Sequence, residues 1–96
     1  METEHNHFFY VLHCADGSYY GGYTIDLARR LTQHNEGKAS KYTRTRLPAF
    51  LLHAERFDTK REAMQAEYSF KQLSRLKKDH YLMERRNRHD SNAAKL

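Results

Sequence analysis

The feature that most constrains the fold is an Asp16-Gly17 pair between two runs rich in aromatic residues. Asp-Gly flanked by strand-forming residues is a strong signal for a β-hairpin. The sequence therefore predicts two antiparallel strands within residues 7–24. Gly21-Gly22 interrupts the second strand, and glycines in a strand indicate close approach by another part of the structure. We expect another backbone or a ligand to lie against this strand.

Two capping signals predict helices after the hairpin. Asp26 is a favourable N-cap, and the apolar spacing that follows predicts a helix over residues 26–35. Thr59 and Glu62 fit the capping-box pattern and predict a helix over residues 60–73. Both helices are expected to bury one apolar stripe.

The remaining segments are a connection, a third strand and a last helix. Residues 36–47 are polar and basic and predict a connection, whereas residues 48–56 have strand character. Ser74 can cap a final helix. From about Glu84 the chain is almost wholly polar, so we expect it to fray there.

Length, charge and cysteine content restrict the class of protein. A chain of 96 residues forms one domain with a modest core. The net charge of +5 favours a polyanionic partner, although a plain solvated basic surface would give the same value. The single cysteine, Cys14, excludes an intrachain disulfide, and no apolar run reaches the length of a membrane span. We expect a soluble protein of a reducing compartment, the cytoplasm.

Glu67 is the most informative single position. It lies four residues after Ala63 and three before Phe70, on the stripe that the helix should bury. An ionised carboxylate is costly in such a stripe unless it is paired or holds a cation. It could form an ion pair with Arg30 or Lys71, lie at the edge of the stripe, or bind a metal. The residue alone leaves these alternatives open.

Five side chains together suit the cutting of a phosphodiester. A phenol can take or relay a proton, a guanidinium can hold phosphate oxygens, and a carboxylate can hold one divalent metal. Singly, each has a structural alternative, because tyrosines are common in strands and a histidine near a helix end can act as a cation. Their combination and spacing carry the inference; they are Tyr10, Tyr20, Arg30, His34 and Glu67.

These residues and the Tyr20-Gly21-Gly22 run resemble the motifs of the GIY-YIG nuclease superfamily. The resemblance covers residues 7–83 and is strongest to the small stand-alone, UPF0213-like members. Phe8 and Phe9 stand where the first motif element has Gly and Ile, and Gly21 stands where the second has Ile. These are packing positions, so the departures concern local geometry more than chemistry.

The resemblance implies a small α+β fold, with a three-stranded antiparallel sheet flanked by helices. It implies one domain over residues 7–83, with flexible tails at 1–6 and 84–96. The implied activity is metal-dependent hydrolysis of nucleic-acid phosphodiester bonds. Alternatives are a non-cleaving nucleic-acid-binding module with the same fold, and a subunit whose basic face binds a protein partner.

The resemblance also implies a role for each side chain. Glu67 would hold one Mg²⁺ or Mn²⁺, and Arg30 would stabilise charge that develops on the phosphoryl oxygens. Tyr10 or Tyr20 would activate the attacking water, and His34 could orient a group or relay a proton. We therefore expect the two phenols, the guanidinium and the carboxylate to line one cleft.

The connection between the first helix and the third strand supplies the expected nucleic-acid contacts. Its cations would follow a phosphate backbone, with DNA favoured over RNA and no membrane partner. Because no element is obviously built to contact base edges, we expect salt-sensitive and weakly selective binding. The sequence leaves the oligomeric state open. The residues concerned are Lys38, Lys41, Arg44 and Arg46.

Overall fold

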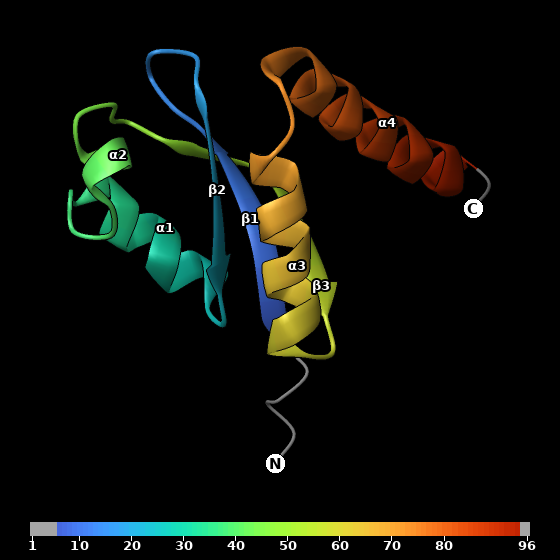
Figure 1. Cartoon of the computed structure of the whole chain (residues 1–96), viewed down its shortest axis with the longest axis horizontal. Helices are drawn as coiled ribbons and strands as arrows, with labels where there is room; N and C mark the ends of the chain where they lie inside the picture. Colours follow the sequence, from blue (N-terminus) through green and yellow to red (C-terminus); the bar gives the residue numbers. More distant parts are fainter. Residues whose placement is uncertain (1–5, 95–96) are drawn as a thin grey trace.

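Three strands form one antiparallel sheet with the expected hairpin at one side (Figure 1). The computed structural model describes residues 6–94, with side chains to Arg86, so the predicted tail residues 1–5 and 95–96 lie outside the described chain. The strands are β1 (His7–His13), β2 (Tyr19–Thr24) and β3 (Phe50–Phe57). Their order is β2-β1-β3, so β1 is central and β2 is an edge strand. The predicted α+β class is confirmed.

The hairpin turn is held by the residues that predicted it. Gly17 has φ of +86°, a left-handed conformation that glycine adopts without steric cost. Asp16 Oδ1 accepts a hydrogen bond from Ser18 N at 3.0 Å. Cys14 N donates to Ser18 O at 2.9 Å and closes the turn.

Aromatic side chains, rather than a backbone or a ligand, explain the two glycines of β2. Tyr10 is the cross-strand partner of Gly22, and a Cβ on that glycine would lie 2.5 Å from Tyr10 Cζ. A Cβ on Gly21 would lie 3.3 Å from a ring carbon of Phe70 and 3.5 Å from Phe9. Tyr10 therefore packs over β2 on one face of the sheet, and Phe70 and Phe9 pack over it on the other.

The two predicted capping residues both start helices. Asp26 accepts from Arg29 N at 3.1 Å at the start of α1 (Leu27–Asn35). Thr59 Oγ1 accepts from Glu62 N at 3.1 Å at the start of α3 (Lys60–Lys71). These interactions satisfy backbone N–H groups that a helix N-terminus leaves unpaired.

Two helical features differ from the sequence prediction. The connection contains a short helix, α2 (Lys41–Arg44), because Ser40 Oγ accepts from Tyr42 N at 3.0 Å and starts a turn. The last helix, α4, runs over Arg75–Ala94 and so continues past the point at which fraying was expected. None of the helices in the described chain is both long enough and apolar enough to span a bilayer.

The sheet has a core on each face. One face buries Tyr10, Leu12 and Cys14 under α1, and the other buries Phe9, Val11 and Phe70, with α3 and the start of α4 above them. In Figure 1, α1 and α2 lie beside β2, and α3 runs along the strands. Because β2 is at the edge, side chains from both layers can meet there.

Candidate active site at the edge of the sheet

Tyr10 forms the centre of the candidate site. Its side chain crosses Gly22, the residue beside it on the edge strand, so the phenol oxygen lies toward the outer side of β2. The residue is 1% exposed. Burial, together with Tyr20, raises the pKa of Tyr10 to about 12, although the nearby Arg30 guanidinium acts to lower it. The phenol is therefore neutral at physiological pH.

His34 lies directly behind the Tyr10 phenol. Its Nε2 is 2.8 Å from Tyr10 Oη, and its Nδ1 is 2.8 Å from Thr43 Oγ1. Burial lowers the pKa of His34 to about 4, and the nearby charge of Arg30 acts in the same direction. The imidazole is therefore uncharged at neutral pH, with one nitrogen as donor and the other as acceptor.

Arg30 comes from α1 and reaches the same edge strand. Its Nη1 donates to the carbonyl oxygen of Tyr23 in β2 at 3.4 Å, and its Nε donates to Gln33 Oε1 at 3.2 Å. The guanidinium is close enough to Tyr10 to lower the pKa of the phenol. This places a positive charge beside the buried phenol, which is where a phosphate would need one.

Tyr20 covers the outer side of the pair formed by Tyr10 and His34. Its ring centroid is 5.1 Å from that of His34 and 6.4 Å from that of Tyr10. It also stacks on Tyr42 of α2, with centroids 6.0 Å apart and planes at 28°. Tyr20 is partly exposed, so it is the phenol that solvent and a substrate can reach directly.

Glu67 approaches from the opposite layer. It belongs to α3, which packs on the Phe9 face, yet its charge raises the pKa of Tyr10 on the other face. The Glu67 side chain is 16% exposed, and its carboxylate forms an ion pair with Lys71 Nζ at 2.8 Å. The same ammonium lies 5.9 Å from the Tyr20 ring centroid. Glu67 therefore reaches the edge of β2, and the ion pair with Lys71 is one of the alternatives that the sequence left open.

Direct contacts thus join Tyr10, Tyr20 and His34 beside β2, and Arg30 and Glu67 lie near enough for their charges to act on the Tyr10 phenol. The described residues contain no group of three or more His, Cys, Asp or Glu side chains that could enclose a metal ion. Any metal here would have Glu67 as its carboxylate ligand and would depend on water or substrate oxygens for the rest.

The predicted cations of the connection differ in their exposure and in the contacts that hold their side chains. Lys41 and Arg44 are exposed on α2, and Lys38 is exposed with a 3.8 Å ion pair to Glu36. Arg46 is held instead, because its Nε binds Asp16 at 2.9 Å and its guanidinium carbon lies 3.9 Å from the Tyr42 ring centroid. The structure thus divides the expected basic surface into three exposed cations and one that also fixes the hairpin turn.

Sequence reasoning missed Thr43 and Tyr42, which both lie on the short helix α2. Thr43 is fully buried against His34, and Tyr42 extends the stack on Tyr20. The available signal was Ser40, a strong N-cap residue three positions before Thr43. Recognising that cap would have predicted the helical turn that places Thr43 against His34 and Tyr42 against Tyr20.

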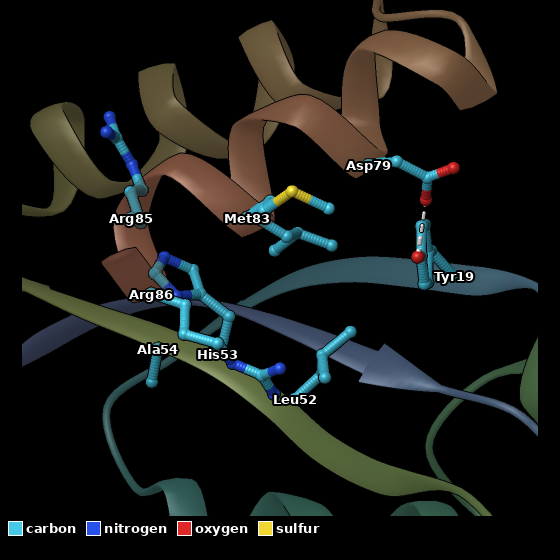
Figure 2. Close-up of a pocket in the computed structure, with 9 residues that line it drawn as sticks. Tyr19, Leu52, His53, Ala54, Asp79, Met83, Arg85 and Arg86 are labelled. Atoms are coloured by element: carbon cyan, nitrogen blue, oxygen red, sulfur yellow. Dashed lines mark hydrogen bonds between the residues drawn. The ribbon is translucent and has the colours of Figure 1, made fainter. Parts of the chain in front are cut away.

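A pocket lies elsewhere, between α4 and β3 (Figure 2). Its volume is about 610 Å³, and its lining includes His53, Met83 and Arg85. Beside it, Glu55 accepts hydrogen bonds from His53 Nε2 at 2.7 Å, Tyr81 Oη at 2.6 Å and Arg85 Nε at 2.7 Å. These contacts tie α4 to the sheet, on the face opposite Tyr10.

Comparisons with known proteins find relatives that match most of the chain. The family model described as the GIY-YIG catalytic domain matches residues 6–81. A UPF0213 protein of Bacillus velezensis is 65% identical over 86 residues, covering 90% of this chain and 86% of its own. The UPF0213 protein YazA of Bacillus subtilis is 60% identical over 87 residues, covering 91% and 87%.

Solved structures give the same relationship. The solution NMR structure of the UPF0213 protein BH0048 from Bacillus halodurans has a TM-score of 0.55 at 48% identity, covering 80% of this chain and 82% of that one. The solution NMR structure of EF2693 from E. faecalis has a TM-score of 0.57 at 51% identity, covering 81% and 83%. Both similarities extend over most of the chain.

Proposed function

Because this chain belongs to the GIY-YIG catalytic-domain family, we propose that it is an endonuclease that hydrolyses nucleic-acid phosphodiester bonds with one divalent metal ion. The observation that carries the proposal is the buried Tyr10 phenol, which lies 2.8 Å from His34 Nε2 and near enough to Arg30 and Glu67 for their charges to shift its pKa. These groups come from both layers of the fold, and packing alone does not require a phenol, a guanidinium and a carboxylate to share one place.

Tyr10 is assigned as the group that takes a proton from the attacking water. It is the phenol with an acceptor for its own proton, since His34 Nε2 lies 2.8 Å from its oxygen. As the water oxygen bonds to phosphorus and the P–O bond to the leaving nucleotide oxygen breaks, the phenol would receive the water proton and pass its own proton to His34. The leaving oxygen would take a proton from solvent. Tyr20 lies over this pair and would contact the incoming phosphodiester first.

Arg30 and Glu67 would stabilise the charge of the reacting phosphate. Arg30 offers planar donors suited to phosphoryl oxygens. A single carboxylate is a sufficient protein ligand for Mg²⁺ or Mn²⁺, because such ions keep several waters and bind substrate phosphates. The residues present therefore fit one metal held by Glu67, which would supply Lewis acidity when bound. When no metal is bound, Lys71 neutralises the Glu67 carboxylate.

The exposed cations of the connection favour a nucleic-acid substrate, with DNA preferred over RNA. Lys38, Lys41 and Arg44 lie on one segment, which follows His34 and also carries Tyr42. Phosphate contacts of this kind give affinity that falls with salt and does not depend on sequence. Their position would guide a strand toward Tyr20.

A second candidate is a module that binds nucleic acid without cutting it. The observation in its favour is the ion pair between Glu67 and Lys71, which satisfies the carboxylate without a metal. Under this alternative, the same basic segment binds the backbone, and the buried phenol serves packing.

Cleavage and binding measured together separate the two candidates. Wild-type protein is assayed on duplex, single-stranded and branched DNA and on RNA, with Mg²⁺, Mn²⁺ or a chelator. We expect metal-dependent cutting that Glu67→Gln abolishes while binding stays near wild type. Glu62→Gln, the same change at an exposed position of the same helix, is the control and should cut normally. Binding without cutting in any metal favours the second candidate, and full activity of Glu67→Gln contradicts the proposed mechanism.

A further inference from the structure

The imidazole of His34 is held from both sides by single hydrogen-bonding groups. Nε2 is 2.8 Å from Tyr10 Oη, and Nδ1 is 2.8 Å from Thr43 Oγ1. His34 is 1% exposed and Thr43 is 0% exposed, so the polar contacts of both side chains come from the protein. A neutral histidine has one protonated nitrogen, and its partners decide which one.

On the Thr43 side, the hydroxyl hydrogen already has an acceptor. Thr43 Oγ1 donates to the carbonyl oxygen of Ser40 at 3.4 Å, a local contact typical of residues at the start of a helix. A hydroxyl has only one hydrogen, so toward His34 its oxygen acts as an acceptor. The group that donates to it is then Nδ1–H.

On the Tyr10 side, the same tautomer follows independently. Arg30 is close enough to lower the pKa of the phenol, but a guanidinium offers no acceptor for the phenol hydrogen. The phenol hydrogen therefore points to the acceptor within reach, His34 Nε2. If Nε2 carried the proton instead, it would donate to the phenol oxygen and leave the phenol hydrogen unpaired, which is costly for a buried group.

We propose that Thr43 is a positioning residue that fixes His34 in the Nδ1–H tautomer and leaves the Nε2 lone pair directed at the Tyr10 hydroxyl. Ser40 supports this placement by starting the helical turn, since its Oγ accepts from Tyr42 N at 3.0 Å and its carbonyl binds Thr43. In the proton transfer, the Tyr10 O–H bond breaks as an N–H bond forms at His34 Nε2, and the phenol takes the water proton. The hydrogen on Nδ1 stays there, hydrogen-bonded to Thr43 Oγ1. The consequence for cleavage rests on the proposed function, whereas the tautomer does not.

The test compares three substitutions on two readouts. Thr43→Val removes the hydroxyl at nearly constant shape, Thr43→Ser keeps it, and Thr45→Val makes the same change at an exposed threonine of the same turn. The tautomer is measured from ¹⁵N chemical shifts of the imidazole nitrogens at neutral pH, with His34→Gln used to assign the signals. Cleavage is measured on the substrate cut best by wild type.

We expect Nδ1–H at His34 in wild type, Thr43→Ser and Thr45→Val, and a mixed or reversed tautomer in Thr43→Val. Cleavage should fall at least about tenfold in Thr43→Val and be restored by Thr43→Ser, as for other outer partners that orient a histidine. An Nε2–H or doubly protonated His34 in the wild type overturns the proposal, even if no variant folds. An unchanged tautomer in folded Thr43→Val also overturns it. If the tautomers follow expectation but wild type cuts nothing, the proposed function fails while the assignment of Thr43 stands.

Discussion

On the face of the sheet that α3 and α4 cover, the core consists of Phe9, Val11 and Phe70, whereas the face under α1 buries Tyr10 in contact with His34. Apolar side chains stabilise a fold through burial and need no particular partner. Buried polar side chains are costly unless each finds one. Both faces therefore bury apolar side chains, but among the described residues only the second also holds buried polar groups, such as His34, that need particular partners.

The largest expected effect on stability is on the apolar face. Phe70→Ala should lower the free energy of unfolding by about 3–5 kcal/mol, because Phe70 is 1% exposed and contacts Phe9 and Tyr81. Phe50→Ala is the control, since that ring is 64% exposed and should matter little. Urea unfolding measures both. Similar losses in the two variants would show that the Phe9 face is not the main source of stability.

Glu55 is the polar exception on that face and should make stability depend on acid pH. Burial raises the pKa of this carboxyl, but hydrogen bonds from His53 and Tyr81 and the charge of Arg85 outweigh it and lower the pKa to about 2. A depressed folded-state pKa gives stability that is present above the ordinary pKa of 4.5 and is lost as pH falls toward 2.

The size of this contribution is at most about 3 kcal/mol. It is measured as the difference in unfolding free energy between wild type and Glu55→Gln from about pH 6 to the lowest pH at which both fold. We expect the difference to shrink steadily below about pH 4.5. A difference that does not change with pH would mean that Glu55 does not hold α4 through its charge.

Substitutions at the adjacent glycines of β2 allow the effects of disturbing the two faces to be compared within one strand. Gly22→Ala should destabilise by about 1–3 kcal/mol and displace the Tyr10 phenol, because the added Cβ would lie 2.5 Å from Tyr10 Cζ. Gly21→Ala meets Phe70 at 3.3 Å and should cost less, since a shift of a few tenths of an ångström relieves it. Thermal unfolding and cleavage rates are compared. Equal effects on cleavage would remove the distinction between the faces.

The fold was largely predictable because its local signals are strong. Asp16-Gly17 sets the hairpin turn, and Asp26 and Thr59 start the helices that they were expected to cap. The short helix α2 was missed because its N-cap, Ser40, lies within a basic segment without apolar periodicity. The continuation of α4 was missed because polar composition alone suggested fraying.

The candidate site was predictable only in part. The position of Glu67 on its helix indicated a carboxylate that needs a partner, and the structure supplies Lys71. The burial of His34 between Tyr10 and Thr43 depends on how α1 packs beside α2. No local pattern specifies that packing, so the contact between Thr43 and His34 could not be predicted, although the Ser40 cap signalled the turn that carries Thr43.

The central claim is that the polar face serves chemistry more than stability. It is tested most directly by measuring the cleavage rate and the unfolding free energy of Tyr10→Phe, with Tyr68→Phe as the control because Tyr68 is 66% exposed. Loss of the hydroxyl leaves His34 Nε2 without its partner, so Tyr10→Phe should lose about 1–3 kcal/mol of stability. Its cleavage rate should fall by about 100-fold or more while it remains folded. A folded Tyr10→Phe that cuts at the rate of Tyr68→Phe would contradict the account.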